Sequence, residues 1–98
     1  MRFVQIVEFR TGRIDELDAY FDAWIARTQG QRVPHRAQLG RDRDIEGRYQ
    51  LVVEFASYDI GMENSRRPQT AEFAQFLASV CDGPPTFRNI DVLRDEDL

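Results

Sequence analysis

A single histidine, His35, is the one side-chain type in this sequence that titrates near neutral pH without help from its surroundings. It follows Pro34 at the start of an expected strand. If its ring lies on the strand face that meets the helices, it stands at a pocket mouth and can act as a general base. The alternative is an exposed histidine on an edge strand. We take His35 as the candidate catalytic residue.

Two aromatic residues of the first expected helix are candidates for binding a small molecule. Trp24 lies on the apolar stripe of residues 14–28, where it can form either a pocket wall or part of the core. Tyr20 lies at the edge of that stripe. Its hydroxyl group could enter a cavity or remain in water, and we include both residues in the predicted substrate site.

The segment around Pro68 supplies the remaining candidates. Pro68 interrupts a helix, and the freed backbone groups can be satisfied locally by Asn64 or Ser65. Alternatively, Asn64 gates a pocket, and Arg66 or Arg67 binds an anionic substrate, with two hydrogen bonds if the anion is a carboxylate. The competing interpretation is that these arginines are solvated. We predict substrate-binding roles for Asn64 and Arg66.

Two further polar residues, Gln5 and Cys81, are candidates for a ligand contact and for a nucleophile. Gln5 lies among apolar neighbours on a central strand, so its amide needs a partner, either a ligand, a water molecule or a group across a dimer interface. Cys81 follows a helix C-terminus, where the helix dipole raises a thiol pKa. We therefore do not expect Cys81 to be a nucleophile.

The composition excludes several classes of chemistry. All 13 basic residues are arginine, which excludes a lysine Schiff base and a phosphate-loop lysine. One histidine and one cysteine exclude a zinc site built from these types alone, and an internal disulfide. A net charge of −4 has the wrong sign for a nucleic-acid partner. No apolar run approaches the ~20 residues of a membrane helix. One free cysteine suits the cytoplasm, where we expect the protein.

The apolar spacing predicts six successive structural units, one of them a broken helix. Ser57 is a suitable helix N-cap, and Pro68 fits the first turn of a new helix. The order β-α-β-β-α-β predicts a ferredoxin-like α+β fold, with a four-stranded antiparallel sheet and the helices on one face. We expect one domain over residues 1–94 and an acidic tail over 95–98. The expected strands are 2–10, 34–41, 48–55 and 86–94, and the expected helices are 14–28, 58–65 and 68–81.

Apolar residues on both faces of the first strand predict self-association. Val4 and Ile6 point one way, and Phe3, Val7 and Phe9 point the other. Helices can cover only one of these faces, and exposing several large apolar side chains is costly. A second copy packed on the open sheet face solves this problem. We therefore expect a homodimer through that face.

The chain resembles antibiotic-biosynthesis-monooxygenase-like domains of the dimeric α/β-barrel superfamily. The resemblance covers essentially the whole chain and rests on residues 3–9, 12–17, 49–55, 57–58 and 83–92. It implies two sheets that form an eight-stranded barrel across a dimer, with a small-molecule pocket between sheet and helices in each subunit. Members include cofactor-free oxygenases of polycyclic aromatic compounds and haem-degrading enzymes.

The resemblance also indicates which of the two activities, haem degradation or cofactor-free oxygenation, fits this chain. Haem-degrading members place an iron-ligating histidine on the second helix and an asparagine on the first strand. Here residues 58–81 contain no histidine, and the first strand offers Gln5. We therefore expect no haem, metal or other cofactor. The predicted function is binding of a small apolar or aromatic molecule, with cofactor-independent oxygenation as the reaction. The alternative is a non-catalytic dimeric ligand-binding or accessory protein, so enzymatic activity remains open.

Overall fold

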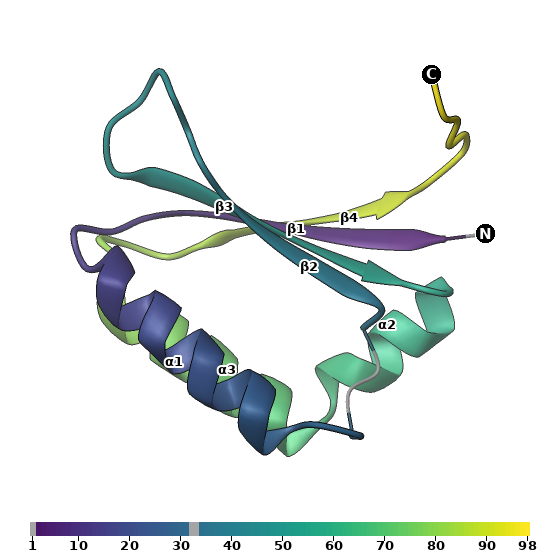
Figure 1. Cartoon of the computed structure of the whole chain (residues 1–98), viewed down its shortest axis with the longest axis horizontal. Helices are drawn as coiled ribbons and strands as arrows, with labels where there is room; N and C mark the ends of the chain where they lie inside the picture. The colour runs from purple at the N-terminus through teal and green to yellow at the C-terminus, as the bar shows by residue number, and fades with distance from the viewer. Residues whose placement is uncertain (1, 32–33) are drawn as a thin grey trace.

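Four antiparallel strands form a sheet in the order β2-β3-β1-β4, and helices cover one of its faces (Figure 1). The computed structural model describes residues 2–31 and 34–98. The expected α+β fold is confirmed, with the second helical region divided in two. The strands are β1 (Phe3–Arg10), β2 (Arg36–Arg41), β3 (Arg48–Phe55) and β4 (Thr86–Asp91), and the helices are α1 (Ile14–Arg27), α2 (Tyr58–Ser65) and α3 (Pro68–Val80).

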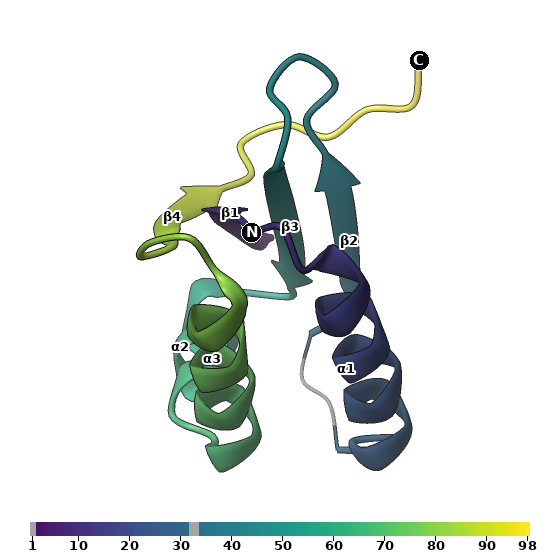
Figure 2. The ribbon, with the colours of Figure 1, turned by 90° about the vertical axis from the view of Figure 1, so that its left-hand side faces the viewer.

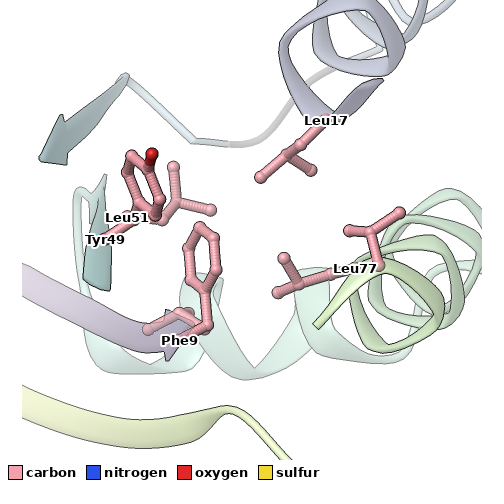
Figure 3. Packing of buried hydrophobic residues seen from close by; sticks show 7 residues of the cluster. Phe9, Leu17, Tyr49, Leu51 and Leu77 are labelled. Carbon is pink, nitrogen blue, oxygen red and sulfur yellow. The ribbon is translucent and has the colours of Figure 1, made fainter. Parts of the chain in front are cut away.

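The pairing of β1 with β3 decides which side chains meet the helices. Phe3 lies opposite Phe55, and Val7 lies opposite Leu51. All four are buried on the helix-facing side. Successive side chains of a strand alternate between faces, so this register also fixes the orientation of the neighbouring strands. Figure 3 shows the resulting core, in which Phe9, Tyr49 and Leu51 of the sheet face Leu17 and Leu77 of the helices.

The opposite face of the sheet has no helix over it in the described part of the chain (Figure 2). Val4, Ile6 and Val52 lie on this open face and are only partly buried, and Ile90 of β4 is 41% exposed. The turn over residues 42–47 and the C-terminal segment both rise on the same side (Figures 1 and 2). The apolar open face expected from the alternation of β1 is therefore present.

The helices begin and end at the residues whose local sequence predicted it. The Ser57 hydroxyl accepts a hydrogen bond from the Ile60 N–H at 3.3 Å, and Pro68 opens α3. Gly30 after α1 and Gly47 before β3 have positive φ values of 80° and 79°. Both conformations disfavour a residue with a side chain.

Most element boundaries agree with the expected ones, three differ by one residue, and larger differences occur at the start of β2 and the end of β4. The ladder between β2 and β3 starts at Arg36 rather than 34, although the His35 N–H donates to the Glu54 carbonyl at 2.9 Å. Strand β4 ends at Asp91 rather than 94. The Val92 N–H still donates to the Arg2 carbonyl at 3.0 Å, but β1 begins at Phe3 and offers no further partner strand.

The close approach of α2 to the sheet gives a stability prediction. A Cβ atom at Gly61 would lie 2.7 Å from a ring carbon of the buried Phe3. Such overpacking costs about 1 to 3 kcal/mol. We expect Gly61→Ala to lower the free energy of unfolding by that amount, measured by urea titration. The matched control is Gly12→Ala, because nothing lies within 4 Å of a Cβ there. Equal stabilities of the two variants would contradict this packing.

Candidate functional site

A pocket of about 300 Å³ lies between the sheet and the helices. Its wall takes residues from all seven elements of the described chain, which is why the site forms only when the whole fold is assembled. The volume is at the lower end of the range for small-molecule pockets. The sheet contributes Gln5, Val7, Arg36, Ala37, Leu51, Val53, Phe55 and Phe87, and the helices contribute Phe21, Trp24, Ile25, Asn64, Thr70, Phe73, Ala74 and Leu77.

Aromatic side chains of α1 and α3 form one wall of the pocket. The Trp24 ring meets the Phe73 ring edge to face, with centroids 5.7 Å apart, and Phe21 meets Phe73 in the same way. The Trp24 indole N–H donates to the Gln69 carbonyl at 3.4 Å. This bond satisfies the only polar atom of the indole, so the ring presents an apolar surface to the pocket.

His35 lies on the helix-facing side of the sheet and lines the pocket. The register explains this placement, because Ala37 pairs with Val53 and His35 lies two residues earlier on the same face. The residue itself is exposed, so it stands at the rim of the pocket rather than in its interior. The alternative from the sequence, an exposed histidine at an edge strand, agrees with this exposure, and the general-base role of His35 stays a prediction.

The Gln5 side chain finds its partner within the same sheet. Its amide nitrogen donates to the Asn89 Oδ1 of β4 at 3.3 Å. Asn89 pairs with Gln5 in the β1–β4 register. The three partners considered from the sequence were a ligand, a water molecule and a group across a dimer interface, and the side chain of a neighbouring strand was not among them. Gln5 also lines the pocket, where it adds a polar group to a mostly apolar wall.

Asn64 lies where α2 ends, and it contacts both the main pocket and a second cavity. The second cavity, of about 10 Å³, is large enough for one water molecule. It shares Trp24, Pro34, Asn64 and Thr70 with the main pocket, so the two spaces adjoin. The small cavity is completed by Thr28, Gln31, Arg67 and Gln69.

Tyr20 and Arg66 do not line either cavity. The Tyr20 ring stacks on Phe76 with centroids 4.0 Å apart and an interplanar angle of 6°. Its hydroxyl is buried without a hydrogen-bond partner among the described residues. Arg66 is the exposed C-cap of α2, whereas its neighbour Arg67 borders the small cavity.

The choice between these two arginines follows from the proline after them. A residue before proline is pushed into extended backbone, and Arg67 has φ −76° and ψ 142°. Arg66 keeps near-helical angles, with φ −92° and ψ −4°. The chain therefore changes direction at Arg67. The sequence contains the signal for this extended backbone, but the position of Arg67 beside the small cavity follows from how the elements pack.

Cys81 has no feature of a reactive thiol. Burial raises the pKa of the Cys81 thiol, and the neighbouring Asp82 carboxylate adds to this effect. Thiolate is the nucleophilic form, so a raised pKa lowers reactivity.

Within residues 2–31 and 34–98, we find no group of three or more histidine, cysteine or acidic side chains placed to hold a metal ion. Over the same residues, no helix is long and apolar enough to cross a membrane.

The fold is similar to that of several solved structures. A mutant of SnoaB, a cofactor-independent oxygenase from Streptomyces nogalater, matches with a TM-score of 0.78 and 17% identity, over 96% of this chain and 95% of that chain. A protein from Caulobacter crescentus CB15, provisionally named an antibiotic biosynthesis monooxygenase, matches with a TM-score of 0.78 and 16% identity, over 95% and 91%. A protein from Bordetella bronchiseptica with the same provisional name matches with a TM-score of 0.77 and 19% identity, over 95% and 98%.

These matches confirm the ferredoxin-like α+β fold expected for the single chain. No protein-family model and no curated protein matches the sequence. The chain therefore has the ferredoxin-like α+β fold of antibiotic-biosynthesis-monooxygenase-like domains.

The unpartnered Tyr20 hydroxyl gives a prediction that separates a structural role from a binding role. A buried hydroxyl without a partner costs roughly 1 to 3 kcal/mol. We expect Tyr20→Phe to raise the free energy of unfolding by about 1 kcal/mol, measured by urea titration, because the Phe76 stacking is kept. Loss of stability in this variant would show that the hydroxyl has a favourable partner.

Proposed function

We propose that this protein binds a small apolar or aromatic molecule in the pocket between sheet and helices and oxygenates it without a cofactor. The observation that supports this proposal is the composition of the pocket wall. Aliphatic and aromatic side chains dominate it, and only a few polar side chains, among them Gln5, His35, Asn64 and Thr70, interrupt it. An apolar ring would be desolvated on most of its surface, and these polar groups would orient it.

The proposed reaction needs a base and a place for negative charge. Proton loss from an acidic methylene of an aromatic ketone gives a carbanion, which transfers electrons to dioxygen and forms a carbon–oxygen bond. A second proton loss and cleavage of the oxygen–oxygen bond leave a carbonyl group. One oxygen atom remains in the product and the other leaves as water, so methylene plus dioxygen gives carbonyl plus water. The substrate supplies all the electrons, and no cofactor is required.

His35 is the residue we assign to the proton transfer. It stands at the pocket rim, and the other basic residues of the sequence are arginines, which are poor bases because they stay protonated. The Asn64 side chain carries donors that can stabilise an oxyanion inside the pocket. Trp24 would hold the ring of the substrate by stacking and edge contacts.

We further propose that the protein works as a homodimer through the open face of its sheet. Val4, Ile6 and Val52 form an apolar centre on this face, and Ile90 lies next to Val4 in the β1–β4 register. Ion pairs surround it: Arg48 pairs with Glu8 at 3.0 Å. A second sheet packed here would remove the apolar centre from water.

The second candidate function is ligand binding without turnover, as in an accessory protein. It is favoured by the exposure of His35, because general bases work best in a water-excluded site. Both functions use the same pocket. They differ in whether the bound molecule consumes oxygen.

The activity test uses anthrone, a tricyclic ketone with an acidic methylene, as the probe. We expect one dioxygen consumed for each anthraquinone formed, measured with an oxygen electrode and by absorbance. His35→Ala should lower kcat by about 10²-fold or more, as expected for loss of a general base. Gln75→Ala, on the exposed surface of α3, is the matched control. Thermal stabilisation by anthrone without oxygen uptake would favour the accessory function instead.

The dimer prediction is tested by sedimentation velocity at micromolar concentration. We expect the wild-type protein to sediment as a dimer and Val52→Glu to raise the dissociation constant at least tenfold, because it places a charge in the apolar centre of the interface. Ala71→Glu adds the same charge on the exposed surface of α3 and should remain dimeric. A wild-type monomer under these conditions would be incompatible with the proposal.

A further inference from the structure

The small cavity beside the main pocket is bordered by a different set of residue types. Most residues around the main pocket are apolar, whereas most residues around the small cavity are polar or charged, Arg67 among them. Asn64 and Thr70 border both spaces, so the two spaces adjoin there. The site therefore has an apolar body, and polar residues border its extension at one end.

Arg67 brings a positive charge to this extension. Its guanidinium donates to the Gln31 carbonyl, which is a neutral acceptor. Two arginines border the cavities, Arg36 at the main pocket and Arg67 at the small one, and neither forms an ion pair with any residue in 2–31 or 34–98. A guanidinium whose hydrogen-bond partner is a carbonyl has no carboxylate beside it to neutralise its charge.

The donors around the small cavity suit an anion. Arginine carries five N–H donors in a fixed planar arrangement that matches the oxygens of a carboxylate. One donor is used by Gln31, which leaves others for a ligand. The Asn64 amide and the Thr70 hydroxyl can each donate at the junction of the two spaces. The cavity has room for one water-sized group, so one carboxylate oxygen fits where a water molecule would otherwise bind.

We propose that the ligand class of this site is an aromatic or aliphatic ring compound that carries a carboxylate. The ring occupies the 300 Å³ pocket against Trp24, and the carboxylate lies at its junction with the small cavity, where Arg67 binds it. Arg67 is thus a specificity-determining residue. This inference rests on the proposed function, because it requires that the main pocket holds a ligand.

The assignment distinguishes two adjacent arginines of equal charge. Arg66 lies in the exposed C-cap of α2 and borders neither cavity, whereas Arg67 borders the small one. A surface arginine attracts an anion only through a screened interaction. Replacing each of them in turn therefore separates a site-specific contact from a general effect of positive charge.

The test compares 2-naphthoate with its neutral counterpart, 2-naphthamide, by isothermal titration calorimetry on the full chain. The two probes share ring, size and shape and differ in charge. We expect 2-naphthoate to bind the wild-type protein at least tenfold more tightly. Arg67→Gln should weaken 2-naphthoate at least tenfold and change 2-naphthamide by less than twofold. Arg66→Gln and Arg43→Gln should leave both affinities within twofold.

A second substitution protects the test against a loss of folding. Arg67→Lys keeps the charge but loses the planar arrangement of donors, so 2-naphthoate should bind with intermediate affinity. Circular dichroism confirms that each variant is folded before titration. If Arg67→Gln does not fold, the preference of Arg67→Lys for 2-naphthoate must still fall below that of the wild type, or the inference is overturned.

The outcomes separate this inference from the proposed function. Equal binding of both probes to the wild-type protein, or a loss at Arg66→Gln in place of Arg67→Gln, overturns the carboxylate assignment and leaves the pocket proposal standing. Failure of both probes to bind contradicts the proposed function and this inference with it.

Discussion

The antiparallel pairing of β1 with β3 is the interaction on which the rest of this structure depends. Cross-strand pairs such as Phe3 with Phe55 and Val7 with Leu51 place their large side chains on one face. A shift of one residue would turn all of them to the other face and leave the helices without a core. The same sheet brings His35, which directly precedes the edge strand β2, to the rim of the pocket. The β1–β3 pairing therefore determines both which side chains form the core and which side of the sheet bears the pocket.

The sequence predicted the fold well because its signals are local and strong. Ser57, Pro68 and Gly47 each act through their own backbone or the next few residues, so no tertiary information is needed. The alternation in β1 also predicted two apolar faces. The sequence was less informative at the end of β4, because the ladder there stops where its partner β1 begins at Phe3 rather than at a signal within β4.

The site was predicted less completely because its details depend on which elements pack together. Trp24 and Asn64 line the pocket, but Tyr20 faces Phe76 of α3, a contact that helix periodicity cannot specify. The Gln5 partner depends on which strand lies beside β1, since Asn89 is 84 residues away in the sequence. By contrast, the extended backbone of Arg67 follows a local rule for residues before proline, which the sequence does contain.

Because each of the seven elements contributes to the pocket wall, folding and occupancy of the pocket are thermodynamically linked. A bound molecule would bridge strands and helices that otherwise meet only through a modest core. Its binding energy would be distributed over the whole chain, and the native state as a unit would gain it. Conversely, a substitution that loosens any single element also loosens a part of the pocket wall. In this chain of 98 residues, the elements that form the pocket wall are the same elements that form the core.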